Sequence, residues 1–144
     1  MTTSKIRHYL ITVENAISLL RKCGIQPTPQ RMAVVNYILK TTTHPSADEV
    51  LDKVRKECPT LSRATVYNTL NLMVKKSLLK TQVLREGTVV FDPNIKRHHH
   101  FIDEVSGKIY DIPWDALKVT GENSLEDFEV KEFQVILRGR KKFK

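Results

Sequence analysis

The stretch that decides the fold runs Ser62-Arg63-Ala64-Thr65-Val66-Tyr67-Asn68-Thr69-Leu70-Asn71-Leu72-Met73. It predicts a helix because Ser62 is a favoured N-cap residue and because the apolar Val66, Leu70 and Met73 recur at the spacing of one helix face. The other face is polar, and it carries Arg63, Thr65, Tyr67, Asn68 and Asn71. The helix therefore has one side to bury and one side to offer to a partner.

Three further helices are expected before this stretch. Apolar residues at helical spacing predict the first over residues 6–22, with Gly24 as its C-terminal stop. Thr28-Pro29 begins the second, as an N-cap followed by a proline at the first helical position. Ser46-Ala47-Asp48-Glu49 is a capping box for the third, which is expected to end near residue 57, before Pro59.

A β-hairpin is expected after the helices, from residues 79–84 and 88–92 around a turn at 85–87. Helices followed by a hairpin in this order indicate a winged helix-turn-helix, in which the helix after Ser62 enters the DNA major groove. The candidate DNA-binding residues are Arg63, Thr65, Tyr67 and Asn68, since Asn pairs bidentately with adenine and Arg with guanine. A solvated polar helix face explains any one of them equally well.

The charge distribution favours a nucleic-acid partner for the first part of the chain. The net charge is +8, and residues 1–91 hold 14 Lys+Arg against 6 Asp+Glu, whereas residues 92–144 hold 10 of each. Localised positive charge is the usual electrostatic footprint of a domain that binds phosphate backbones. The alternative is a basic face that serves only solubility.

The pattern breaks at Pro93-Asn94, which we interpret as a boundary between a DNA-binding domain (1–92) and a second domain (93–144). We expect strands at 98–104 and 108–112, a short helix around 114–119 and a last strand near 128–137 with a bulge at Lys131-Glu132. The basic tail 138–144 is expected to fray. The fold class is therefore α+β, a winged helix-turn-helix followed by a small α/β domain.

A neutral domain of about 50 residues is small for independent stability. It is best explained as a dimerisation domain, and a two-fold homodimer would bind a palindromic double-stranded operator. The apolar candidates for the dimer contact are Trp114, Leu117, Phe128, Phe133 and Val135.

Five residues form a candidate metal site: His44, Asp92, His98, His100 and Asp111. In a strand, His98 and His100 point to one face, so His99 points to the other and is expected to be exposed and not a ligand. A mixed nitrogen and oxygen donor set without thiolates favours Fe(II), Mn(II) or Zn(II). Taken singly, each residue has a structural explanation, such as a loop histidine or a charge at the end of a strand.

Together, these segments resemble the ferric uptake regulator (Fur) family. The resemblance is carried by Thr28-Pro29-Gln30-Arg31, His44-Pro45-Ser46-Ala47-Asp48, Ala64-Thr65-Val66-Tyr67-Asn68-Thr69-Leu70, Phe91-Asp92 with His98-His99-His100, and Gly107-Lys108-Ile109-Tyr110-Asp111. Within the family the chain is most similar to the peroxide-sensing (PerR) branch. Iron-sensing members usually carry glutamate in place of Asp111 and arginine in place of Asn68.

The resemblance implies a metal-dependent repressor of oxidative-stress defence genes. One regulatory Fe(II) or Mn(II) per subunit, with Zn(II) possible in vitro, would bind at the hinge between the two domains. Hydrogen peroxide would then oxidise a ligand histidine, with His44 and His98 as the candidates. Asp103 and Ser106 replace one cysteine pair of the family's structural zinc site, and residues 139–142 replace the other, so no four-cysteine zinc site is expected.

Three other functions stay open at this point. The nearest is a Fur-type regulator that senses only the level of iron, manganese or zinc. A non-haem Fe(II) enzyme with two histidines and a carboxylate is less consistent with a small basic chain, so an enzyme is not expected. The third is a winged-helix protein without a sensor. No apolar run approaches the roughly 20 residues of a membrane span, and the N-terminal residues 1–8 lack the apolar region of a signal peptide, so we expect a cytoplasmic protein. Cys23 and Cys58 are isolated, which predicts no disulfide framework.

Overall fold

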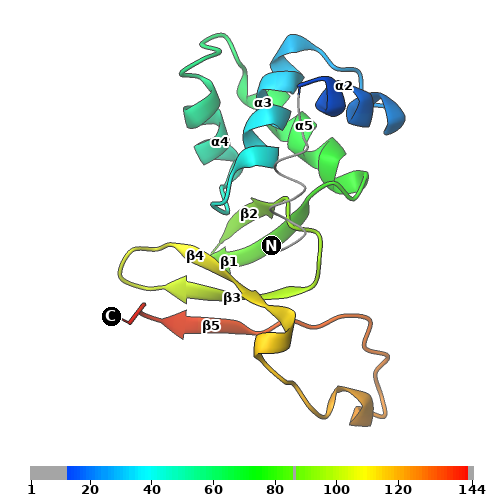
Figure 1. The fold of residues 1–144 in the computed structure, drawn as a ribbon, viewed down its shortest axis with the longest axis vertical. Helices are drawn as coiled ribbons and strands as arrows, with labels where there is room; N and C mark the ends of the chain where they lie inside the picture. Colours follow the sequence, from blue (N-terminus) through cyan, green and yellow to red (C-terminus); the bar gives the residue numbers. More distant parts are fainter. Residues whose placement is uncertain (1–12, 86, 143–144) are drawn as a thin grey trace. The chain divides into compact units, whose positions relative to one another are not determined.

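The computed structural model describes residues 13–85 and 87–142, which fall into two compact units, the first ending at Ile95 and the second beginning at Lys96. The first unit holds helices α2 (Val13–Lys22), α3 (Pro29–Lys40), α4 (Ala47–Val54) and α5 (Arg63–Lys75), with strands β1 (Lys80–Arg85) and β2 (Thr88–Asp92) (Figure 1). The second holds β3 (His98–Asp103), β4 (Ile109–Pro113), β5 (Ile136–Gly139) and two 3-10 helices, η1 (Trp114–Ala116) and η2 (Glu122–Ser124).

The helix starts lie where the N-cap residues predict them. The side-chain oxygens of Thr28, Ser46 and Ser62 each accept a hydrogen bond from the backbone N–H three residues later, at Arg31, Glu49 and Thr65. Each bond satisfies one of the N–H groups that have no partner in the first turn of a helix. Local sequence chemistry therefore sets where α3, α4 and α5 begin.

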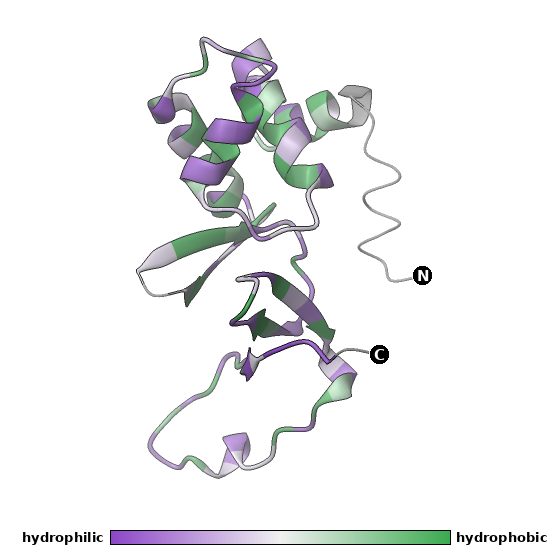
Figure 2. Cartoon of the chain, turned by 90° about the vertical axis from the view of Figure 1, so that its left-hand side faces the viewer, coloured by the Kyte–Doolittle hydropathy of each residue, from purple (hydrophilic) through white to green (hydrophobic). Residues whose placement is uncertain are grey.

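The helices of the first unit enclose one apolar core. Val66, Leu70 and Met73 of α5 are fully buried, as the helical spacing predicts, and they pack in a cluster with residues of α2, α3 and α4. Figure 2 shows that each of these helices carries both hydrophobic and hydrophilic residues, as helices on the surface of a core do. Burial of this stripe leaves the polar side of α5 facing outward.

The expected hairpin is confirmed. β1 and β2 pair antiparallel, from Lys80 opposite Asp92 to Arg85 opposite Thr88, with an irregularity between Val83 and Arg85. Phe91 of β2 is buried in the helical core, which attaches the hairpin to the helices. Helices followed by this hairpin make the first unit a winged helix-turn-helix domain.

The second unit is a three-stranded sheet of order β4-β3-β5. β3 pairs antiparallel with β4, with His100 opposite Asp111, and parallel with β5, with His100 opposite Ile136. The segment between η1 and β5 leaves the sheet as a long loop that carries η2 (Figure 1). The whole chain is thus α+β, and its second part is built on a mixed sheet.

Several predicted boundaries were wrong. The last strand begins at Ile136 and not near residue 128, because residues 128–135 form part of the loop, and the bulge predicted at Lys131-Glu132 has no strand to interrupt. Arg138 and Gly139, predicted to fray, belong to β5.

Two predicted helices also differ from the structure. The helix predicted at 114–119 is a single 3-10 turn. α4 ends at Val54, since the chain turns there and the N–H of Cys58 donates to the Val54 carbonyl. Residues 6–12 of the first predicted helix lie outside the described residues.

Among the residues described, no helix is both long and apolar enough to cross a membrane.

Candidate metal centre and DNA-reading helix

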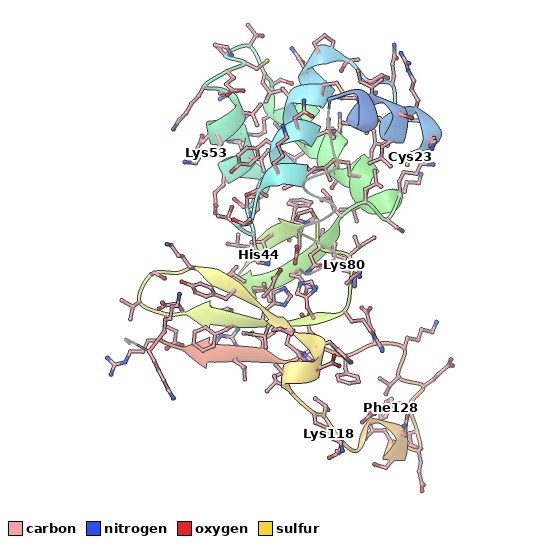
Figure 3. All side chains as sticks on the ribbon, viewed as in Figure 1. Cys23, His44, Lys53, Lys80, Lys118 and Phe128 are labelled. Atoms are coloured by element: carbon pink, nitrogen blue, oxygen red, sulfur yellow. The ribbon has the colours of Figure 1, made fainter. Side chains whose placement is uncertain are left out.

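The first unit positions a histidine and an aspartate together. His44 lies in the loop between α3 and α4 (Figure 3), and the next residue, Pro45, accepts a hydrogen bond of 2.9 Å from the N–H of Phe91 in β2. This bond brings the loop against the end of β2, so that His44 Nε2 lies 3.2 Å from Asp92 Oδ2. The other carboxylate oxygen, Oδ1, accepts the N–H of Asn94 at 2.9 Å. Asp92 is thereby held with one oxygen toward the imidazole.

The second unit brings together the other three predicted ligands. His98 and His100 lie on one face of β3, with their ring centroids 4.5 Å apart. Asp111 of β4 pairs with His100 in the sheet, and its Oδ1 lies 3.5 Å from His98 Nε2 and 3.7 Å from His100 Nε2. The alternation predicted for His98 and His100 therefore holds, and the neighbouring strand supplies the carboxylate.

Both groups have donor atoms that suit a divalent transition metal, at separations near those that such an ion requires. Ligand atoms that each bind one ion at about 2.1 Å lie roughly 3.0–3.4 Å apart in octahedral or tetrahedral geometry. The separation of 3.2 Å in the first unit and those of 3.5 and 3.7 Å in the second are close to this range. Imidazole nitrogens with carboxylate oxygens suit Fe(II), Mn(II) and Zn(II).

Two of the three histidines of β3, His98 and His100, are oriented through their Nδ1 atoms. His98 Nδ1 lies 2.6 Å from the backbone carbonyl oxygen of Lys96. A carbonyl can only accept, so His98 carries a proton on Nδ1, and Nε2, on the side of Asp111, is the nitrogen available to bind an ion. His100 Nδ1 lies 2.9 Å from Gln134 Oε1, which favours the same tautomer. Metal-binding histidines are commonly held in this way by a partner on the second ring nitrogen.

The prediction that His99 is exposed was wrong, although its ring does point away from the other two. The side chain is 1% exposed and stacks on Trp114, with ring centroids 4.6 Å apart and planes 18° apart. The centroid of the Trp114 ring lies 4.9 Å from that of Phe133, and the guanidinium carbon of Arg97 lies 4.8 Å from the Trp114 centroid. The second face of β3 is therefore covered by an aromatic group that alternation alone cannot reveal.

The polar residues of α5 lie on its outward side. Tyr67 is 39% exposed, and Arg63 and Asn68 are also exposed. Arg63 forms an ion pair with Asp48, and Thr65 Oγ1 lies 2.9 Å from Ser62 Oγ in the N-terminal cap. All but Thr65 of the four predicted DNA-binding side chains are therefore exposed, and Arg63 is also held in an ion pair with Asp48.

A hydrogen-bonded turn stands where the resemblance would place a cysteine pair. Asp103 Oδ1 accepts the N–H groups of Val105 at 2.9 Å and of Ser106 at 3.3 Å. The bond from Val105 is the main cause that lowers the pKa of Asp103, with smaller contributions from Ser106 and from the backbone of Lys141, while partial desolvation opposes them. The N–H of Glu104 donates to the carbonyl of Gly139 at 2.8 Å, which ties this turn to the end of β5.

Residues 22–138 match the sequence profile of the ferric uptake regulator family. The chain belongs to this family. A peroxide-responsive repressor, PerR, of Staphylococcus aureus is 33% identical over 129 residues, which cover 88% of this chain and 87% of that protein.

Two solved structures of the family illustrate the likeness. The peroxide-sensing PerR of Streptococcus pyogenes has a TM-score of 0.52 at 29% identity and covers 91% of each chain. The iron-containing ferric uptake regulator of Francisella tularensis has a TM-score of 0.69 at 21% identity, covering 83% of this chain and 93% of that one.

Family membership makes the protein a metal-responsive transcription regulator of a DNA-binding family. Solved structures of the family contain manganese, iron or zinc, which agrees with the nitrogen and oxygen donors of the two groups. Members of this class regulate genes and are generally not enzymes.

Proposed function

We propose that the protein is a metal-dependent transcriptional repressor that senses hydrogen peroxide through oxidation of a ligand histidine. The observation that carries this proposal is the donor set, three imidazoles and two aspartates, in the two groups described above. The 33% identity to a peroxide-responsive repressor supports the same reading.

In this proposal one ion per subunit binds both groups. His44 and Asp92 supply two ligands and His98, His100 and Asp111 supply three, and neither set alone fills the coordination shell of an octahedral ion. An ion bound by both groups would hold the winged helix in one position relative to the second domain. Residues 93–97, which connect the two domains, would then be fixed in one conformation. Binding that favours one arrangement shifts the population toward it, which is the basis of allosteric control.

In this proposal the first unit binds DNA and the second unit forms the dimer. Residues up to 92 would bind DNA through Arg63, Thr65, Tyr67 and Asn68, and residues from 93 would form the homodimer that recognises a palindromic operator. The loop before β5 carries Phe128, which Figure 3 labels. It offers apolar surface for the dimer, since Phe128 is 72% exposed and Leu125 is 50% exposed.

A bound Fe(II) ion would activate hydrogen peroxide by giving it one electron, which the ligand histidine would return as it is oxidised, so the ion is not consumed. In the net reaction one peroxide oxygen enters a ring C–H of His44 or His98 and the other leaves as water, so the histidine loses two electrons and the peroxide gains them. Both rings lie against a carboxylate that would bind the same ion. The oxidised imidazole is a poorer ligand, so the domains would be released and the operator would dissociate. With Mn(II) the protein would bind DNA but respond poorly to peroxide.

The second candidate is a regulator that senses only the level of iron, manganese or zinc. The same donors would serve it, and the structural likeness to the Francisella tularensis regulator gives it support. The two functions differ in whether the ligands are chemically altered.

The deciding experiment uses a palindromic duplex selected from a random pool by the Mn(II)-loaded protein. Binding of this duplex by anaerobic Fe(II)-loaded protein is measured before and after stoichiometric peroxide, with peptide mass mapping of the same samples. Loss of binding together with one added oxygen on the His44 or His98 peptide supports peroxide sensing. Retained binding with unmodified histidines leaves the metal-level regulator.

A further inference from the structure

The middle histidine of the triplet has a position that the metal site does not require. His99 is fully buried, and its Nδ1 accepts the backbone N–H of Val135 at 2.9 Å. Accepting at Nδ1 requires the proton of the neutral ring to be on Nε2, the opposite tautomer from that of His98. Three consecutive histidines therefore alternate in tautomer as well as in direction.

The same residue, Val135, is bound to β3 a second time. Its carbonyl accepts the N–H of His100 at 3.1 Å. Both backbone groups of Val135 are thus paired with consecutive residues of β3, just before β5 begins at Ile136. The stacking of His99 on Trp114 adds to this attachment by restricting rotation of the His99 ring.

The attachment determines where Gln134 lies. Gln134 directly precedes Val135, at the end of a loop that has no helix or strand from residue 125 to residue 135. Gln134 is exposed to solvent, yet its side-chain Oε1 lies 2.9 Å from His100 Nδ1. The amide oxygen can only accept, so His100 carries a proton on Nδ1, and Nε2, on the side of Asp111, is the nitrogen available to bind an ion.

We propose that His99, Val135 and Gln134 form a bracket that positions His100 as a metal ligand. His99 holds the backbone of Val135, Val135 places Gln134, and Gln134 selects the tautomer and ring orientation of His100. Gln134 and His99 are positioning residues, because neither is a ligand of the proposed ion. The inference deepens the proposed function and rests on the regulatory site described there.

The bracket has a consequence for metal affinity. Removal of a partner on the second nitrogen of a ligating histidine typically weakens metal binding about 10–100-fold. Gln134→Leu removes the acceptor at an exposed position, where the fold should not depend on it. Gln134→Glu keeps an acceptor and adds charge to it, so it should bind metal at least as well as the unmodified protein.

The experiment combines two measurements on the full-length protein. In metal-free protein at pH 8, ring ¹⁵N spectra should show His98 and His100 protonated on Nδ1 and His99 protonated on Nε2. Calorimetric titration with Mn²⁺ should show about 10–100-fold weaker binding for Gln134→Leu. Gln82→Leu, the same change in strand β1, is the matched control and should bind Mn²⁺ as the unmodified protein does.

His99 variants test the first part of the bracket. His99→Leu should weaken Mn²⁺ binding, and His99→Asn, whose amide oxygen can accept the Val135 N–H, should recover part of the loss. An Nε2-protonated His100, or equal Mn²⁺ affinity for Gln134→Leu and Gln82→Leu, overturns the bracket. If the unmodified protein shows the expected tautomers but binds no Mn²⁺, it is the proposed metal site that fails, and the positioning role fails with it.

Discussion

His44 and Asp92 are brought together by a hydrogen bond that neither side chain makes. The N–H of Phe91 donates to the carbonyl of Pro45, so the residue before Pro45 and the residue after Phe91 are placed side by side, with His44 Nε2 3.2 Å from Asp92 Oδ2. Residues far apart in sequence thus meet because a backbone bond joins their neighbours.

Asp92→Asn should weaken Mn²⁺ binding by at least about 10-fold, because an amide replaces the carboxylate that we propose as a ligand while the shape of the side chain is preserved. Calorimetry on the purified protein measures the change. Asp52→Asn, at an exposed position on α4, is the control and should bind as the unmodified protein does. Unchanged affinity in Asp92→Asn would remove Asp92 from the ligand set.

Asn68→Ala should reduce the affinity for the selected duplex by about 1–3 kcal/mol and relax the preference at one base pair, because it removes the exposed side chain that we propose reads a base edge. Gel-shift titration against duplexes that differ at single positions measures both effects. Lys75→Ala, at the far end of α5, should instead change affinity uniformly across sequences. The same uniform effect in Asn68→Ala would mean that Asn68 does not read a base.

Phe128→Asp should convert the proposed homodimer to monomer at micromolar concentration, since Phe128 exposes 72% of its surface in one subunit and a charge there would oppose apolar contact with a second copy. Analytical ultracentrifugation measures the mass. Val83→Asp, on the hairpin and 63% exposed, should leave the mass unchanged. A dimeric Phe128→Asp protein would place the contact elsewhere.

Asp103→Asn should lower the free energy of unfolding at neutral pH. It should also reduce the loss of stability that the protein shows as pH falls. The pKa of Asp103 is lowered, chiefly by the Val105 N–H, so its carboxylate stabilises the folded state above the ordinary aspartate pKa, and this contribution is lost as pH falls through the lowered value. Urea unfolding at pH 7 and near pH 3 should therefore show a smaller difference in the variant. An identical difference would mean that the turn does not depend on the charge.

Leu70→Ala should destabilise the first unit by about 2–5 kcal/mol, because the side chain is fully buried and its loss leaves a cavity. Thermal unfolding followed by circular dichroism provides the comparison. Leu125→Ala, where the side chain is 50% exposed, should change the melting temperature little. Similar losses in both variants would indicate that the core is not where the structure places it.

The sequence alone determined what depends on near neighbours. The N-caps at Thr28, Ser46 and Ser62, the buried stripe of α5 and the opposite directions of His98 and His99 all follow from contacts within a few residues, where backbone geometry leaves few choices. Residue type and the alternation of a strand made His98 and His100 candidate ligands, whereas the complete set of five rested on the resemblance to the family.

The tertiary structure decided what depends on distant partners. β5 begins at Ile136 because parallel pairing with β3, not local propensity, selects its start. His99 is buried because Trp114 and Val135 arrive from elsewhere in the chain, and Asp111 meets His98 and His100 through the β3–β4 register. Such contacts depend on the closure of long loops and on packing of the whole unit, which a local pattern does not encode.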